Sequence, residues 1–177
     1  MKIAIIGTHF SGKTELVREL SDLFKERYSE GSLATITEII RRCPLPVNEG
    51  TIFEAQKWIL MQQIKEEIEK SGSKIIVSDR SVVDNYIYMM RKFPEQARAF
   101  LPLVLEHAKT YDYIFKTAPL ETEIEDDGFR DTSPEFRAEI EDMLKKFLTE
   151  NKIGFHDLPS ENSAEFILKV VSDEAAD

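Results

Sequence analysis

An eight-residue run near the amino terminus, GTHFSGKT from Gly7 to Thr14, restricts the possible folds more than any other feature of the sequence. It follows the apolar run Lys2–Ile6 and leads into a segment with leucines at helical spacing. Glycines allow successive backbone N–H groups to curl around an anion, and the following helix points its positive end at the same anion. The run therefore predicts a buried strand, a phosphate-binding loop and a helix, in that order.

The last two residues of this loop pattern have chemical roles of their own. Lys13 can reach the terminal phosphates of a nucleotide, and the hydroxyl of Thr14 can bind Mg²⁺. A chance match in an ordinary strand–turn–helix is the alternative, but the flanking elements favour phosphate binding. We interpret His9 as a loop residue rather than as a reactive group. The predicted phosphate-binding residues are Gly7, Thr8, His9, Phe10, Ser11, Gly12, Lys13 and Thr14.

Short apolar runs alternate with segments of helical periodicity along the chain. This order predicts an α/β fold of three layers, with a parallel sheet covered by helices on both faces. In such sheets ligands bind beyond the carboxyl ends of the strands. The predicted strands are Lys2–Ile6, Leu33–Ile39, Lys74–Ser78, Tyr111–Lys116 and Ile153–Leu158.

The segments between the strands carry helix signals. Capping pairs predict helix starts at Thr51 with Glu54 and at Ser81 with Asp84, and Ser133 before Pro134 predicts another. Apolar stripes at helical spacing predict which faces are buried. One stripe consists of Phe53, Trp58, Met61, Ile64 and Ile68, and another of Phe136, Ile140, Met143, Leu144, Phe147 and Leu148.

The composition excludes several classes of protein. The 177 residues suit a single domain spanning residues 1–177. A net charge of −10 argues against a nucleic-acid partner, because such binding depends on clustered Lys and Arg. Cys43 is the only cysteine, so no disulfide can form within the chain and a reducing compartment is expected. No apolar stretch approaches the roughly 20 residues that span a bilayer, and no signal peptide is recognisable, so we expect a cytoplasmic protein without a membrane partner.

A second polar motif follows the third predicted strand, in the sequence SDRSVVDNYIY. Asp79 stands at the strand end, where a carboxylate can bind Mg²⁺ opposite Thr14. Arg80 offers a planar donor for a phosphate or a carboxylate. The alternative for Asp79 is a turn or cap residue, but Ser81 competes for the cap, and Asp84 fits the capping box rather than the site.

Three motifs together, GTHFSGKT, SDRSVVDNYIY and the acidic segment DDGFRDTSPEFR, resemble those of the P-loop nucleoside and nucleotide kinases. The chain looks most like the ribosylnicotinamide kinase domain of the bifunctional NAD-biosynthesis regulator, and next like thymidylate and deoxynucleoside kinases. The resemblance covers essentially the whole chain. It implies a P-loop NTPase fold with five parallel strands in the order 2-3-1-4-5, ATP and Mg²⁺ as cofactors, and a nucleoside or nucleotide as phosphoryl acceptor.

The resemblance also implies residues for the acceptor site. Glu38, at the end of the second predicted strand, matches the glutamate that deoxynucleoside kinases use as the base for a 5′-hydroxyl. A hydroxyl nucleophile must lose its proton during transfer, so Glu38 favours a hydroxyl acceptor. Its alternative role is a surface ion pair with Arg41 or Arg42. Gln56 matches the glutamine that reads the acceptor base, and its amide can both donate and accept.

A polar, turn-rich stretch at residues 121–137 matches the position of the kinase lid. Lid arginines close on the transferring phosphates and exclude water. Arg130 is the main candidate for this catalytic role and Arg137 the lesser one. The segment offers only these two arginines, where deoxynucleoside kinases have several, and the alternative is a solvated acidic loop in which Arg130 balances its neighbours.

The leading hypothesis is an ATP-dependent kinase that acts on a small molecule, with Lys13, Glu38, Asp79 and Arg130 as catalytic residues. The alternative is an ATP-binding NTPase or regulatory switch without a small-molecule acceptor. A GTP-reading switch is disfavoured, because Asn151-Lys152-Ile153-Gly154 lacks the aspartate that pairs with guanine. An inactive protein of the same fold has no physical need for Lys13, Thr14 and Asp79 together. Leu101–Leu105 fits either the core or an oligomer interface, so an oligomer is possible.

Overall fold

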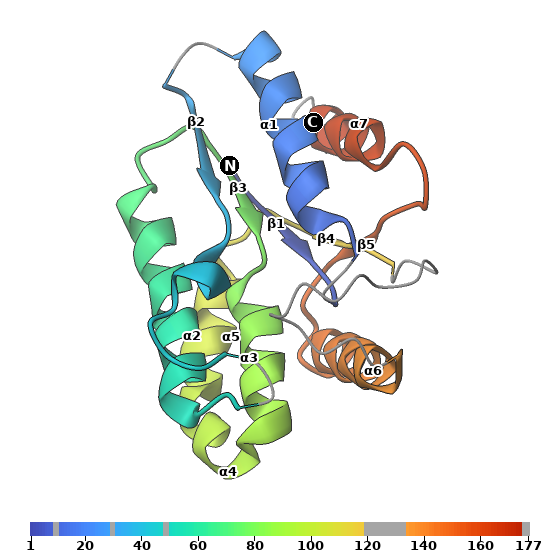
Figure 1. The fold of residues 1–177 in the computed structure, drawn as a ribbon. Helices are drawn as coiled ribbons and strands as arrows, with labels where there is room; N and C mark the ends of the chain where they lie inside the picture. Colours follow the sequence, from blue (N-terminus) through green and yellow to red (C-terminus); the bar gives the residue numbers. More distant parts are fainter. Residues whose placement is uncertain (9–10, 29–30, 48–49, 119–133, 175–177) are drawn as a thin grey trace.

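The computed structural model describes residues 1–8, 11–28, 31–47, 50–118 and 134–174. The described residues form a parallel sheet of five strands in the order β2-β3-β1-β4-β5 (Figure 1), which confirms the predicted fold class and strand order. The strands are β1 Lys2–Ile6, β2 Leu33–Ile36, β3 Ile75–Asp79, β4 Tyr113–Lys116 and β5 His156–Asp157. β1 lies at the centre of the sheet, paired with β3 on one side and β4 on the other.

Helices cover both faces of this sheet, because successive residues of β1 point to opposite sides. Ile3 and Ile5 pack against α1 and α7, whereas Ala4 and Ile6 face the layer that contains α2, α3, α5 and α6 (Figure 1). The helices are α1 Lys13–Arg27, η1 Ile39–Arg42, α2 Phe53–Glu69, α3 Val82–Lys92, α4 Pro94–Ala97, η2 Arg98–Phe100, α5 Leu101–Ala108, α6 Pro134–Glu150 and α7 Ser163–Glu174.

Three predicted strands are too long. β2 ends at Ile36 because Glu38 adopts a left-handed backbone, with φ of 56°, and starts a 3₁₀ turn. β4 begins two residues late, at Tyr113, because the carboxylate of Asp112 accepts a 2.6 Å hydrogen bond from the backbone N–H of Lys2 before the strand pairing starts. β5 is confined to His156–Asp157, since Ile153 and Phe155 use their side chains for packing instead of pairing their backbone with β4.

The buried face of α2 differs from its predicted apolar stripe. Met61 and Ile68 are 44% and 62% exposed, so these two assignments are wrong. The inward positions are taken instead by polar side chains, above all Gln63 and Glu67, which are 0% and 2% exposed. The stripe fails because buried polar groups replace apolar ones where they find hydrogen-bond partners. The stripe predicted on α6 is confirmed, with its members buried or packed against the core.

The capping predictions divide in the same way. Ser81 caps α3 through its own side chain and forms the predicted reciprocal box with Asp84. α2 begins at Phe53 with Ile52 at its N-cap, so the predicted cap by Thr51 is wrong. Val104 lies in the core and Leu103 is 40% exposed, which leaves both predicted roles of Leu101–Leu105 represented. In the part of the chain that the structure describes, every helix is too short or too polar to cross a membrane.

Candidate functional site

The candidate site lies where β1, β3 and β4 end, at the carboxyl edge of the sheet. The loop after β1 turns sharply at Gly7, whose φ is 140°, and reaches α1 through Gly12, the N-cap residue, whose φ is 74°. Both values favour glycine, because a Cβ is rarely tolerated there. At Gly7 the space is closed as well, since a Cβ would overlap the hydroxyl of Thr117 and lie 3.2 Å from its carbonyl oxygen.

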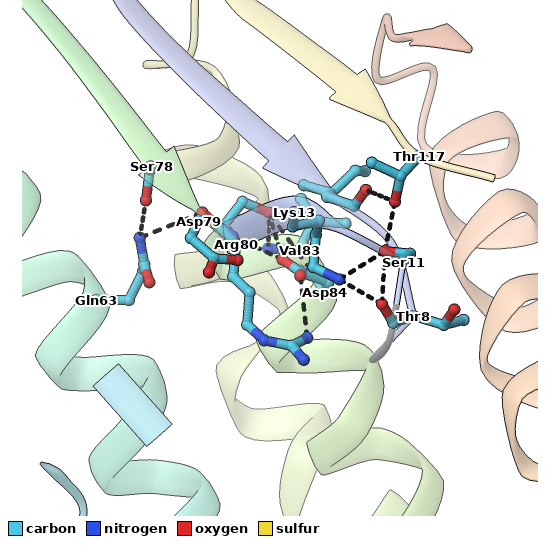
Figure 2. A network of polar contacts seen from close by, with 12 residues as sticks. Thr8, Ser11, Lys13, Gln63, Ser78, Asp79, Arg80, Val83, Asp84 and Thr117 are labelled. Atoms are coloured by element: carbon cyan, nitrogen blue, oxygen red, sulfur yellow. Dashed lines mark hydrogen bonds and ion pairs between the residues drawn. The ribbon is translucent and has the colours of Figure 1, made fainter. Parts of the chain in front are cut away.

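A chain of polar contacts holds the loop and its lysine (Figure 2). Lys13, which is 5% exposed, donates from Nζ to the carbonyl oxygen of Thr8 and, at 2.9 Å, to Ser11 Oγ. Ser11 Oγ in turn donates to the Thr8 carbonyl at 2.9 Å. Thr117, just beyond β4, approaches Ser11 Oγ to 2.7 Å with its own hydroxyl. The ammonium group is thereby kept inside the loop, in the place where a phosphate group would need a cation.

The end of β3 meets the start of α1 through one short hydrogen bond. Thr14 Oγ1 donates to Asp79 Oδ2 at 2.6 Å. The structure therefore brings together the two residues that the sequence predicts for Mg²⁺. Among the described residues no group of three His, Cys, Asp or Glu side chains gathers as a metal centre of their own. A hydroxyl and a carboxylate do fit Mg²⁺, which takes oxygen ligands and usually keeps waters and phosphate oxygens for the remaining positions.

Arg80 leaves the strand with a left-handed backbone, at φ of 83°, and directs its side chain along α3. Its Nη1 lies 3.3 Å from Asp84 Oδ2, and its guanidinium stacks on the ring of Tyr88 at 5.0 Å from the ring centre. Burial would lower the pKa of Arg80, but Tyr88, Asp84 and Asp79 raise it above its ordinary value. Burial raises the pKa of Asp84, against the opposing effects of Arg80 and Ser81. Arg80 is thus a fixed positive charge beside the site.

The two residues that the resemblance assigns to the acceptor lie on separate elements. Glu38 is about half exposed, and its Oε1 lies 3.5 Å from Arg41 Nε, which is the ion pair considered as its alternative role. Gln56 is 7% exposed on the inner side of α2, and its amide donates to Thr51 Oγ1 at 2.9 Å. Neither residue hydrogen-bonds to the loop or to Asp79 in the bonds described above, so their roles stay predictions.

The remaining predicted site residues fall on other parts of the chain. His9, Phe10 and Arg130 lie outside the described residues. Arg137 lies in the first turns of α6, next to Phe136, whose ring packs 6.1 Å from that of Tyr88. The lid role of Arg130 and Arg137 therefore stays a prediction.

Three residues that sequence reasoning missed contribute to the site. Thr117 occupies the end of β4 as Asp79 occupies the end of β3, so the rule about strand ends would have found it. Ser78 and Gln63 had no such signal. The side chain of Ser78 turns away from the loop, and Gln63 reaches β3 from the middle of α2.

Lys116 shows why a strand-end cation need not bind a ligand. Its Nζ hydrogen-bonds to Glu141 on α6 and lies 3.0 Å from Asp157 on β5. Burial would lower the pKa of Lys116, but these two carboxylates raise it above its ordinary value. The ammonium group is committed to joining β4, β5 and α6.

Comparison with protein families gives one match across almost the whole chain. A family model described as an AAA domain matches residues 2–165. The match includes the loop, Asp79 and every strand of the sheet. No curated protein sequence matches the chain.

Solved structures of kinases share the fold. A deoxyadenosine kinase from M. mycoides, solved with dCMP and dCDP, superposes with a TM-score of 0.67 at 15% identity, covering 99% of both chains. A thymidylate kinase from Ehrlichia chaffeensis gives a TM-score of 0.68 at 15% identity, covering 97% of this chain and 98% of that one. The NadR protein in complex with NR gives 0.72 at 21% identity, covering 91% of this chain and 46% of that one. These likenesses confirm the P-loop kinase fold.

Proposed function

The chain belongs to the AAA domain family, whose members bind nucleotides, and on that premise we propose that it is an ATP-dependent small-molecule kinase. It transfers the γ-phosphoryl group of ATP, bound with Mg²⁺, to a nucleoside, a nucleotide or a related metabolite. The observation that carries the proposal is the 2.6 Å contact between Thr14 and Asp79, which sets a hydroxyl and a carboxylate beside the lysine of a phosphate-binding loop.

The loop supplies the binding site for the phosphates. Backbone N–H groups between Gly7 and Thr14, together with the start of α1, favour a polyanion. Lys13 exchanges its bonds to Thr8 and Ser11 for bonds to phosphate oxygens, while Thr117 keeps its contact with Ser11. Thr14 and Asp79 hold Mg²⁺, which neutralises charge on the transferring group when bound.

The acceptor site is proposed on the other side of Asp79. Arg80, buried and held between Asp84 and Tyr88, offers a fixed charge for a phosphate or a hydroxyl-bearing acceptor. Gln56 reads the base, Glu38 takes the proton of the attacking hydroxyl, and Arg130 closes over the phosphates. The kinases of similar fold support this substrate class, because their structures hold dATP in deoxyadenosine kinase and NR in the NadR protein.

The test is an acceptor screen with purified protein. ADP formation from ATP and Mg²⁺ is measured with nucleosides, nucleotides and nicotinamide riboside, one at a time. The expected result is ADP formation that depends on one acceptor class and is lost in Lys13→Met, which keeps the buried side-chain volume without the charge. ADP formation that no acceptor increases would remove the kinase proposal.

The ion pair between Glu38 and Arg41 favours a second candidate, an ATP-binding NTPase or switch without a small-molecule acceptor. A glutamate that is half exposed and already paired is not oriented toward a substrate hydroxyl. In this case phosphate release from ATP is independent of any acceptor, and partner binding differs between the ADP and ATP forms. The same screen separates the two candidates, because only the kinase responds to the acceptor.

A further inference from the structure

A buried carboxylate outside the phosphate loop makes more hydrogen bonds than any catalytic role described above accounts for. The side chain of Glu67, in the last turns of α2, is fully buried. Its Oε2 lies 2.7 Å from Lys2 Nζ on β1 and 2.7 Å from His107 Nε2 on α5. Its Oε1 accepts two further hydrogen bonds of 2.7 Å, from Gln63 Nε2 and from the hydroxyl of Tyr111.

Both groups bound to Oε1 lead to the same short segment, residues 78–82, which contains Asp79 and Arg80. Gln63 Nε2 lies 2.7 Å from Ser78 Oγ and 3.4 Å from the carbonyl oxygen of Arg80 (Figure 2). The hydroxyl of Tyr111 accepts a 3.0 Å hydrogen bond from the backbone N–H of Val82, at the start of α3. One carboxylate oxygen therefore holds the segment from both ends.

The charge of Glu67 fixes the direction of these bonds. An ionised carboxylate only accepts hydrogen bonds, so it must face the nitrogen of the Gln63 amide and the proton of the Tyr111 hydroxyl. The pKa of Glu67 is below its ordinary value, because the bonds from His107, Lys2 and Gln63 outweigh the effect of burial, which raises it. Gln63 consequently presents its N–H group to β3, and Tyr111 presents a lone pair to Val82.

The segment between the two attachments needs such support. Arg80 has a left-handed backbone at φ of 83°, which a residue with a Cβ adopts only where its surroundings hold it there. Its neighbour Asp79 must keep its carboxylate within 2.6 Å of the Thr14 hydroxyl. A shift of the segment would move the carboxylate and the arginine together.

We propose that Gln63 and Tyr111, oriented by Glu67, are positioning residues that hold residues 78–82 so that Asp79 and Arg80 face the nucleotide and the acceptor. This inference rests on the proposed function for its effect on nucleotide and metal, but the positioning itself concerns the unligated protein. The residues act through the backbone and through Ser78, and they touch neither substrate nor metal.

The test uses two variants and one matched control in the full chain. Gln63→Met removes the amide at nearly the same length, and Tyr111→Phe removes only a hydroxyl and keeps the ring that packs 4.6 Å from Lys2 Nζ. Gln62→Met makes the same chemical change one residue away, where the amide bonds to Glu66 instead. Tyr111→Phe keeps the proposal testable if Gln63→Met does not fold.

The first readout is amide hydrogen exchange of Arg80, Ser81 and Val82 in the nucleotide-free protein, followed by NMR. The second is the ratio of the ADP dissociation constants without and with Mg²⁺, which reports on Thr14 and Asp79. We expect faster exchange in both variants and a fall of about 10-fold in the Mg²⁺ ratio, the low end of the effect of outer partners on metal sites. Metal-free ADP affinity and both readouts of Gln62→Met should match the wild type.

Each other outcome decides against one defined claim. Unchanged exchange in both variants overturns the positioning, and faster exchange with an unchanged Mg²⁺ ratio overturns its role in the site. If the wild-type protein binds no nucleotide, the proposed function is wrong, and hydrogen exchange decides the positioning alone. In that case faster exchange in both variants supports it and unchanged exchange overturns it.

Discussion

At the scale of single residues, Gly7 is the position where the loop tolerates least change. We predict that Gly7→Ala destabilises the protein by overpacking, at a cost of about 1–3 kcal/mol, and weakens ADP binding. The added Cβ would overlap the hydroxyl of Thr117, and φ of 140° strains any residue with a Cβ. Urea unfolding and ADP titration measure the two effects.

Two further variants isolate the steric part of this prediction. Adding Thr117→Ala removes the hydroxyl that the new Cβ meets and should recover part of the stability lost in Gly7→Ala. Gly154→Ala is the control, because a Cβ there meets no described atom within 4 Å. Equal stability of Gly7→Ala and Gly154→Ala would contradict the crowding seen at the loop.

Thr14 tests the other half of the site. We predict that Thr14→Val lowers the Mg²⁺-dependent part of ADP affinity by about 10-fold or more, because the hydroxyl that bonds to Asp79 at 2.6 Å is lost. Isothermal titration with and without Mg²⁺ measures it. Thr149→Val is the matched control, since it removes a helix hydroxyl that bonds only to the backbone carbonyl of Lys145. An unchanged Mg²⁺ effect in Thr14→Val would mean that Thr14 is not a metal ligand.

At the scale of elements, the amino end of α3 depends on a single serine. Ser81 Oγ accepts from the N–H groups of Val83 and Asp84 and donates to the Asp84 carboxylate. We predict that Ser81→Ala lowers the free energy of unfolding by about 0.5–2 kcal/mol, the usual cost of losing such a cap. Urea unfolding measures the change. Glu54→Ala, at the start of α2 where the predicted capping box is absent, should stay within about 0.5 kcal/mol of wild type.

The elements themselves could be predicted from local sequence wherever apolar period and caps agree. β1 and the start of α3 are examples, because Lys2–Ile6 is continuously apolar and Ser81 is followed three residues later by Asp84. α2 was misread because its buried face carries Gln63 and Glu67. A polar residue inside a core is stable only with partners from distant segments, here Lys2, Ser78 and Tyr111, and helical periodicity does not contain those partners.

At the scale of the whole molecule, the site could be predicted only where the chain order determines it. Parallel strands end at the same edge, so the sequence brings the loop after β1 and Asp79 after β3 together, and the structure has Thr14 in contact with Asp79. Thr117 follows by the same rule. The ion pair of Glu38 and the network around Glu67 depend instead on side-chain directions and on helix packing, which chain order leaves open.

The network around Glu67 also gives the whole molecule an acid response with a definite sign. The pKa of Glu67 lies below its ordinary value of 4.5, because hydrogen bonds from His107, Lys2 and Gln63 outweigh the raising effect of burial. The folded state therefore binds the proton less readily than the unfolded state. The stability that Glu67 contributes is fully present above about pH 4.5 and is lost as the pH falls through the folded pKa.

We therefore predict that Glu67→Gln lowers the free energy of unfolding most at neutral pH, by about 3–5 kcal/mol, because it leaves Lys2 and His107 without their carboxylate. The difference from wild type should shrink as the pH falls below about 4.5, since the wild-type carboxylate is then protonated as well. Asp84, whose pKa is raised mainly by burial, acts with the opposite sign but is common to both proteins and cancels in the difference. Urea unfolding across this range measures the trend, with the exposed Glu69→Gln on the same helix as the control. A difference that stays constant with pH would show that Glu67 contributes through packing and not through its charge.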